Sequence, residues 1–183
     1  MRDTTHPTAR RATQRTAIGI ALISALTGFF LLAPHAQAQT RAQTQAAHGP
    51  DADRIAIARA FEAWRNGTGG PYDLLADDAR WTITGNSLAA KTYPSREAFM
   101  SEVIRPFNAR MATPLKPTVR RLYAEGDTVI AFFDAAGTAR DGKPYANTYA
   151  WFLRMKDGRI VEAHAFFDSL AFDDFWRRVT PAP

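Results

Sequence analysis

The sequence predicts an α+β domain in which a strongly curved antiparallel sheet, shaped like a cone, wraps around helices from the domain's N-terminal part. Three observations favour this class. Helical periodicity is confined to the first half of the domain and to its last residues, strand-like segments fill most of the second half, and two Asp-Gly pairs mark hairpins. Helices gathered on one face of an antiparallel sheet define the α+β class. Because the helices cannot fill the deep end of the cone, a blind pocket is expected there.

The first helix is expected to begin at Asp51 or Asp53, either of which can cap it. Its apolar residues recur at three-residue steps, namely Ile55, Ala58, Phe61 and Trp64. The glycine-rich segment 66–70 ends this helix. Pro71 then opens a short helical turn over 72–76, because the fixed φ of proline suits a first helical position.

Two further helices are expected. Ser95 caps the first of them, Pro106 is expected to kink or end it, and its apolar side carries Phe99, Val103 and Phe107. Ser169 is expected to cap a closing helix with the apolar residues Leu170, Phe172, Phe175 and Trp176.

Five strands are expected from β-branched and aromatic residues, at 79–84, 118–124, 128–139, 145–155 and 159–167. The last four form a meander. Asp141-Gly142 and Asp157-Gly158 are strong hairpin signals within it.

Residues 1–38 have the features of a cleavable secretion signal. Three arginines, Arg10, Arg11 and Arg15, precede an uncharged run over 16–39. Ala36-Gln37-Ala38 is the small–x–small pattern of a signal peptidase site, so cleavage is expected after Ala38. The alternative is a membrane anchor, but the apolar centre, 17–33, is at the lower limit for crossing a bilayer. Residues 39–50 then form a flexible leader and 51–183 the domain, in the periplasm or outside the cell, with the export route left open.

Charge and cysteine content exclude several classes of function. The chain has 23 basic and 18 acidic residues, but residues 1–38 hold four arginines and one aspartate, so the remainder carries a net charge of only +2. No basic stripe with interleaved aromatics points to nucleic acid. The absence of cysteine excludes thiolate metal sites and thiol nucleophiles. No cofactor motif is found, since the glycines at 67–70 follow a helix rather than a strand.

The order of elements, together with three short motifs, resembles a known superfamily. The motifs are Asp141-Gly142-Lys143-Pro144-Tyr145-Ala146-Asn147-Thr148-Tyr149, Asp157-Gly158-Arg159-Ile160 and Phe166-Phe167-Asp168. They resemble the SnoaL-like families of the nuclear transport factor 2-like superfamily, which include polyketide cyclases and relatives of ketosteroid isomerase. The likeness covers about residues 53–179 and implies the cone-shaped fold, while the superfamily mixes enzymes with binding proteins.

The resemblance also implies where catalytic groups would lie. The position of the proton-shuttling carboxylate of ketosteroid isomerases is Ile83 here, and that of their oxyanion-hole aspartate is Ala150. Asp168 matches the last aspartate of the limonene epoxide hydrolase relay and the acid of polyketide cyclases. The other relay members would lie on 128–139, where Asp134 is one residue out of register, which turns a side chain to the opposite face.

Asp168 and His164 are the candidate catalytic residues. His164 is the single histidine of 51–183, and its ordinary pKa range suits acid–base chemistry. They share strand parity, but four strand residues span about 13 Å, so they would act together only through ligand or water. The competing interpretations are a histidine bonded to backbone and an aspartate that caps the closing helix.

Dense aromatic residues predict a pocket for a flat apolar molecule. The candidate ligand-binding residues are Trp81, Asn147, Tyr149, Trp151 and Phe166. In 145–153 one face carries the bulky residues and Asn147, and the other carries the small residues and Phe152. Either the bulky face lines the pocket, or it packs against a second subunit, so a homodimer is also expected.

Two functions remain open at this stage. The first is an exported domain that binds a small hydrophobic or aromatic molecule, with no cofactor, metal or nucleic-acid partner and no membrane attachment after signal cleavage. The second is an isomerase, cyclase or epoxide hydrolase in which Asp168 is the general acid or base, assisted by His164 or Tyr149.

Overall fold

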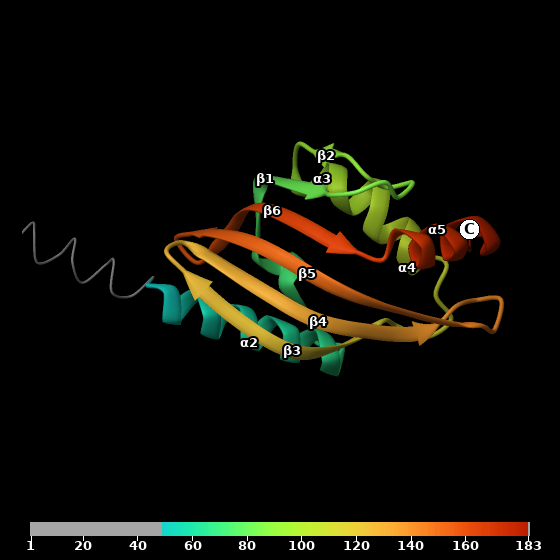
Figure 1. Cartoon of the computed structure of the whole chain (residues 1–183), viewed down its shortest axis with the longest axis horizontal. Helices are drawn as coiled ribbons and strands as arrows, with labels where there is room; N and C mark the ends of the chain where they lie inside the picture. Colours follow the sequence, from blue (N-terminus) through green and yellow to red (C-terminus); the bar gives the residue numbers. More distant parts are fainter. Residues whose placement is uncertain (1–48, 183) are drawn as a thin grey trace, which may run out of the picture. The chain divides into compact units, whose positions relative to one another are not determined.

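The computed structural model describes residues 49–182, so the predicted signal and nearly all of the predicted leader lie outside the described residues. The helical elements are α2 (Pro50–Asn66), η1 (Pro71–Leu74), α3 (Arg96–Phe99), η2 (Met100–Ile104), α4 (Arg105–Asn108) and α5 (Ser169–Arg178). The strands are β1 (Leu75–Ile83), β2 (Thr92–Tyr93), β3 (Lys116–Glu125), β4 (Thr128–Thr138), β5 (Pro144–Lys156) and β6 (Arg159–Phe167) (Figure 1). Among these residues, no helix is long and apolar enough to cross a membrane.

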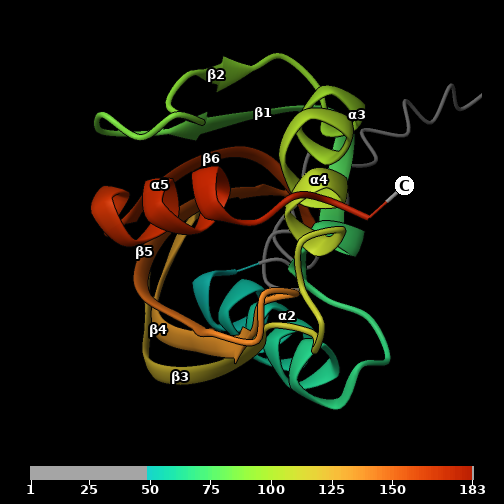
Figure 2. The same cartoon turned by 90° about the vertical axis from the view of Figure 1, so that its right-hand side faces the viewer.

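The six strands form one curved, unclosed sheet in the order β2-β1-β6-β5-β4-β3. Figure 2, which looks nearly along the strands, shows the sheet as a curved wall with α2, α3 and α4 on its concave side. The predicted α+β class is therefore confirmed. All neighbouring pairs are antiparallel except β1 and β6, which are parallel. Hairpins force antiparallel pairing in the meander, whereas the long connection from β1 to β6 leaves either direction open.

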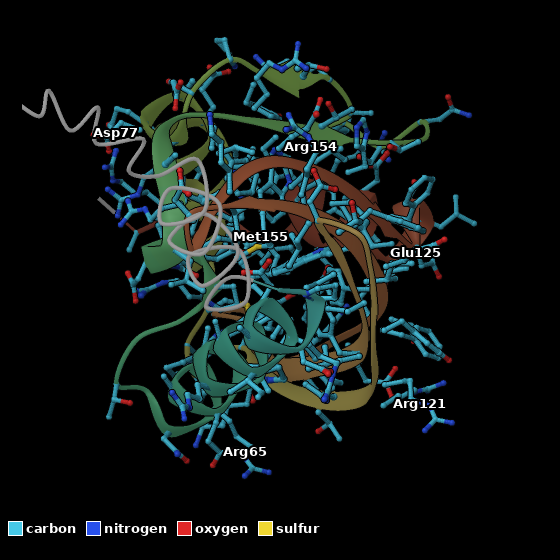
Figure 3. All side chains as sticks on the ribbon, turned by 90° about the vertical axis from the view of Figure 1, so that its left-hand side faces the viewer. Arg65, Asp77, Arg121, Glu125, Arg154 and Met155 are labelled. Atoms are coloured by element: carbon cyan, nitrogen blue, oxygen red, sulfur yellow. The ribbon has the colours of Figure 1, made fainter. Side chains whose placement is uncertain are left out.

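Alternation along β5 separates the two faces of the sheet. From Tyr145 to Met155 every second residue is buried, and the residues between them lie on the outer, convex face. In Figure 3, Arg154 lies on the outside of the sheet and the adjacent Met155 on the inside. The bulky face of this strand is thus the inner one. Of the two possibilities left by the sequence, it therefore faces the interior of the domain and does not pack against a second subunit.

Turn and capping residues explain most of the element boundaries. Asp157 and Gly158 have φ values of 51° and 73°, as the two-residue turn between β5 and β6 requires. Ser95 caps α3 by accepting a hydrogen bond from the backbone nitrogen of Ala98, as expected. The prediction that Asp51 or Asp53 caps α2 was wrong, because Gly49 is the N-cap residue. Both aspartates lie in the first turn of the helix, where their negative charge interacts favourably with the helix dipole.

Two further expectations need correction. Asp168, not Ser169, caps α5, accepting hydrogen bonds from the backbone nitrogens of Leu170 and Ala171. Of the two effects expected of Pro106, a kink or an end of the second helix, the end is not found, because the helix continues to Asn108. The preceding segment η2 is a π-helical turn, whose extra residue accommodates the missing N–H of proline.

Candidate ligand-binding cavity

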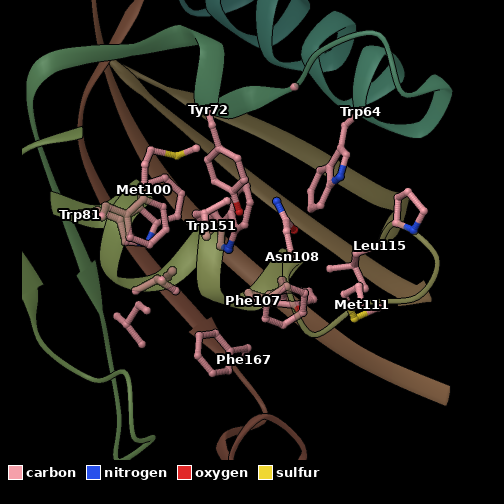
Figure 4. A pocket seen from close by; sticks show the side chains of 18 of the residues that line it. Trp64, Tyr72, Trp81, Met100, Phe107, Asn108, Met111, Leu115, Trp151 and Phe167 are labelled. Carbon is pink, nitrogen blue, oxygen red and sulfur yellow. The ribbon is translucent and has the colours of Figure 1, made fainter. Parts of the chain in front are cut away.

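A cavity of about 570 Å³ lies on the concave side of the sheet. Its walls come from β1, β5 and β6, from the helical segment 96–108, and from the loops at 69–73 and 111–115. Figure 4 shows Trp64, Tyr72, Trp81, Trp151 and Phe167 among the side chains around this space. The sheet–helix pocket expected from the cone shape is therefore present.

Strand parity brings the sheet residues to the cavity. Trp81 and Ile83 of β1, Tyr149 and Trp151 of β5, and Ala165 of β6 all lie on the inner face, and all five are buried. Trp81 pairs with Ala163, Ile83 with Ala165, and Trp151 with Ala165, so the small residues of β6 stand between two rows of large ones. Because the β6 residues are small, the inner face of the sheet has space for a ligand over β6.

Trp151 is the centre of the aromatic wall. Its ring lies within 6.2 Å, centroid to centroid, of six other rings, those of Phe61, Trp64, Tyr72, Trp81, Phe133 and Tyr149. Trp81 in turn stacks on Phe99 of the second helix at 4.4 Å and 11°. These contacts fix large flat surfaces in the wall, and flat surfaces favour a flat ligand.

Two polar side chains lie at the exposed rim of the cavity. Asp73 and Asn108 line the cavity and are exposed. The Asp73 carboxylate accepts a hydrogen bond from the backbone nitrogen of Gly70 at 2.8 Å, which closes the turn at that edge. Opposite it, the loop 111–115 is tied to β4, since Thr138 accepts a backbone hydrogen bond from Ala112 and donates one to the Thr113 hydroxyl, both at 2.8 Å.

A hydrogen-bonded chain of side chains runs from the base of α5 to the cavity wall. The Asn147 amide accepts a bond from the backbone nitrogen of Asp168 at 2.9 Å and donates to that residue's carbonyl at 3.0 Å. The same amide nitrogen also donates to the Tyr145 hydroxyl at 3.2 Å, and that hydroxyl lies 3.1 Å from the hydroxyl of Tyr149. Burial raises the pKa of both tyrosines above the ordinary value near 10, so both hydroxyls stay protonated at neutral pH.

Three of the candidate ligand-binding residues, Trp81, Tyr149 and Trp151, line the cavity together. Asn147 lies behind the wall, buried, and reaches the cavity only through the two tyrosines.

The structure does not bring the remaining candidates to the cavity. His164 lies on the outer face with its side chain half exposed and its Nε2 3.9 Å from a Glu162 oxygen. Phe166 is on the same face and is 43% exposed. The carboxylate of Asp168 caps α5, on the far side of Asn147 from the cavity. Asp134 also faces outward, bonded to Arg120 and Thr148.

Several wall residues were not singled out from the sequence as ligand-binding. They are Trp64, Tyr72, Phe99, Val103, Phe107 and Phe167. The three-residue spacing of Trp64 in α2 and the apolar side of the helix at 99–107 placed most of them in the core. Helical spacing indicates that a side chain faces inward, but it does not distinguish a side chain packed in the core from one that lines a cavity.

The arrangement can enclose a flat ring and donate hydrogen bonds to it. Among the lining residues that the structure describes, the one carboxylate is that of Asp73, at the rim, and none is a histidine. Within residues 49–182, no three histidine, aspartate or glutamate side chains come together in a way that could hold a metal ion.

The comparisons with solved structures agree with this fold. A soil-derived mobile gene cassette protein, Bal32a, is 23% identical and covers 70% of this chain and 98% of its own, with a TM-score of 0.58. An NTF2-like protein from Burkholderia thailandensis is 24% identical over 67% of this chain and 95% of its own, with a TM-score of 0.56. IdmH, a putative polyketide cyclase from Streptomyces antibioticus, is 25% identical over 67% of this chain and 96% of its own, with a TM-score of 0.53. No curated protein matches the chain.

The family model described as a SnoaL-like domain matches residues 57–163, which run from the middle of α2 into β6. This match covers more than half of the chain, with strands β1 to β5 in full and the first part of β6. The chain therefore belongs to the SnoaL-like domain family.

Proposed function

We propose that this protein binds a flat, largely apolar aromatic molecule in the cavity between the sheet and helices α2–α4. The observation that carries the proposal is the cavity itself, about 570 Å³ in volume and walled by stacked and edge-on rings around Trp151. Pockets of this size that are mostly apolar, with a few fixed polar groups, are typical small-molecule sites.

Binding is favoured over catalysis by what lines the cavity. The catalytic alternative uses Asp168 as the general acid or base, yet Asp168 caps α5 and His164 faces outward. Of the three residues named for that alternative, Tyr149 alone lines the cavity. Ile83, at the position that the resemblance equates with a carboxylate, presents an apolar side chain to the cavity. The likeness to IdmH, a putative polyketide cyclase that is 25% identical, supports a polyketide-like ligand and not a particular reaction.

Blocking the cavity tests the proposal. Ala165 is 2% exposed and lines the cavity floor, so Ala165→Leu should reduce the affinity for the tricyclic hydrocarbon fluorene at least about 10-fold, because its side chain takes the ring's place. Equilibrium dialysis measures the dissociation constant, and circular dichroism checks the fold. Ala146→Leu is the matched control, since Ala146 is on the outer face of β5. Absence of fluorene binding in the wild type, or equal affinity in both variants, would count against this site.

We also propose that two copies associate through the outer face of the sheet. Cross-strand neighbours there form an apolar band that contains Tyr123, Ile130, Phe132, Ala150, Phe152 and Phe166. Phe152 and Phe166 are 38% and 43% exposed and contact each other at 5.8 Å. On one side of this band Glu162 is paired with Arg80 and Arg154, and on the other Asp134 is paired with Arg120. An apolar centre flanked by charged groups of both signs suits a self-complementary two-fold interface.

A charge placed in the band tests the dimer. Phe152→Glu should raise the dimer dissociation constant at least about 100-fold, because association would bury an unpaired carboxylate from each copy. Ile55→Glu is the control: Ile55 is 44% exposed but lies on α2, away from the sheet's outer face. Sedimentation velocity distinguishes the two. A wild-type monomer at micromolar concentration, or an unaffected Phe152→Glu dimer, would refute this interface.

Export completes the proposal. The arginines before an uncharged run and the Ala36-Gln37-Ala38 site support removal of residues 1–38 and a periplasmic or secreted protein. N-terminal sequencing of the protein from its native host should then begin at Gln39, and a mature protein that keeps the first 38 residues would contradict it.

A further inference from the structure

His164 lies among the apolar residues on the outer face of the sheet, where the dimer interface is proposed. In the strand register it is directly opposite Phe152 of β5, and Phe166 follows two residues later on the same face of β6. The side chain of His164 is 50% exposed. A second copy that covers Phe152 and Phe166 therefore also covers the imidazole of His164.

The charged groups around His164 carry a net positive charge. On its own strand the nearest is Glu162, with one carboxylate oxygen 3.9 Å from the imidazole Nε2. Arg154 of β5 and Arg80 of β1 pair with that carboxylate at 2.8 and 2.6 Å, and their hydrogen bonds lower its pKa below the ordinary value. Two guanidinium groups and one carboxylate sum to one positive charge. Thr82, which is opposite His164 on β1, is uncharged.

The pH range between about 5 and 8 separates histidine from the carboxylates on this face. Histidine is the side chain whose ordinary charge change falls in that range. His164 is the single histidine among residues 49–182. The carboxylates on either side of the apolar band stay ionised, because hydrogen bonds from neighbouring side chains lower the pKa of Asp134 and of Glu162 below the ordinary carboxyl values.

We propose that His164 makes the dimer sensitive to pH, so that two copies associate when the imidazole is neutral and separate when it is protonated. A neutral ring suits an apolar interface between Phe152 and Phe166. A protonated ring would be buried from each copy beside a cluster that is already positive, and a buried charge without a partner is costly. This inference rests on the proposed dimer and adds its regulation.

The direction of the pH effect follows from where the proton binds better. In a separated copy the outer face is in water, which solvates a charged imidazole. In the dimer the same charge would lose that water, so the separated copies bind protons more tightly than the dimer does. By linkage, acid then shifts the equilibrium towards monomers.

Sedimentation velocity of the purified wild-type protein at neutral pH (about 7.5) and acidic pH (about 5) tests the proposal. The dimer dissociation constant should be at least about 10-fold higher at the acidic pH, which is about 3-fold for each of the two imidazoles. In His164→Gln the two constants should agree within about 2-fold, because an amide gains no charge. His164→Lys is charged at both pH values, so its constant should exceed the wild-type one at least about 10-fold at neutral pH.

A loss of folding in acid would also separate the copies, so each sample needs a check of its tertiary packing. Near-ultraviolet circular dichroism reports the fixed packing of aromatic side chains, which here surround Trp151. The spectrum of the wild type should be the same at both pH values, since the aromatic cluster lies on the inner face of the sheet.

The outcomes distinguish the switch from the dimer. Equal dissociation constants at the two pH values, or a pH dependence that persists in His164→Gln, would overturn the role of His164 and leave the dimer in place. A His164→Lys dimer as tight as the wild type at neutral pH would overturn it as well. A wild-type monomer at both pH values would reject the dimer and the switch together.

Discussion

Replacing Trp151 by alanine is expected to lower the free energy of unfolding by about 3–5 kcal/mol, the cost of removing a large buried aromatic side chain. Trp151 is 3% exposed and contacts six other rings, so its removal opens a void that the surrounding strands β4, β5 and β6 cannot close. Small domains are stable by about 5–15 kcal/mol in total, so the variant should melt far below the wild type. Urea unfolding followed by circular dichroism measures the change.

Trp176 provides the control for Trp151. It is also a tryptophan, but it is only partly buried on α5, where it stacks on Phe172 at 5.1 Å and lies under Arg110. Trp176→Ala should cost less than half as much as Trp151→Ala, because the site opens to solvent and leaves no enclosed void. Similar losses in the two variants would mean that the aromatic cluster is not the centre of the core.

Replacing Gly137 by alanine is expected to have the second largest effect, a loss of about 1–3 kcal/mol, because the added methyl group overpacks a tight contact. A Cβ there would lie 2.7 Å from the Met111 Cε and 3.0 and 3.1 Å from the backbone oxygens of Thr113 and Pro114. The methionine side chain can move, but the two carbonyls belong to the loop that forms one edge of the cavity. Gly137→Ala should therefore also weaken fluorene binding, measured by equilibrium dialysis.

Gly70 provides the control for Gly137. It lies at the cavity rim as well, but a Cβ there would meet the Trp64 Cβ at 3.5 Å, an ordinary contact, and its extended backbone suits any residue. Gly70→Ala should leave stability within about 1 kcal/mol of the wild type, since alanine also restricts the unfolded chain. If Gly137→Ala were equally harmless, the loop 111–115 would not be pressed against β4 as described.

The sequence was sufficient for strands β3 to β6 because their signals are local, whereas the short strand β2 was not expected. The Asp157-Gly158 turn and the alternation along 145–155 set the register of β5 and β6, and the strand expected at 159–167 is observed with the same bounds. The same alternation placed Tyr149 and Trp151 on one face of β5, whereas Trp81 of β1 was singled out only as one of the dense aromatic residues. The parallel pairing of β1 with β6 was not predictable in this way. The two strands are far apart in the sequence, so no turn motif between them indicates that they pair or in which direction.

The chemistry around the cavity was harder to predict, for a physical reason. His164 and Phe166 share a strand with Ala163 and Ala165, and a single residue of parity decides between cavity and outer face. Asp168 had two interpretations from sequence, and the structure places its carboxylate at the first turn of α5. The hydroxyl chain that ends at Tyr149 depends on Asn147 reaching the backbone of Asp168, 21 residues away, and contacts between strands of this kind leave no local pattern.

The most direct test of the account is a crystal structure of the protein grown with fluorene. We expect the tricyclic ring between the sheet and helices α3–α4, against Trp81 and Trp151. A saturated crystal with fluorene on the outer face of the sheet, or with the cavity closed by its own side chains, would contradict the claim that this cavity is the binding site.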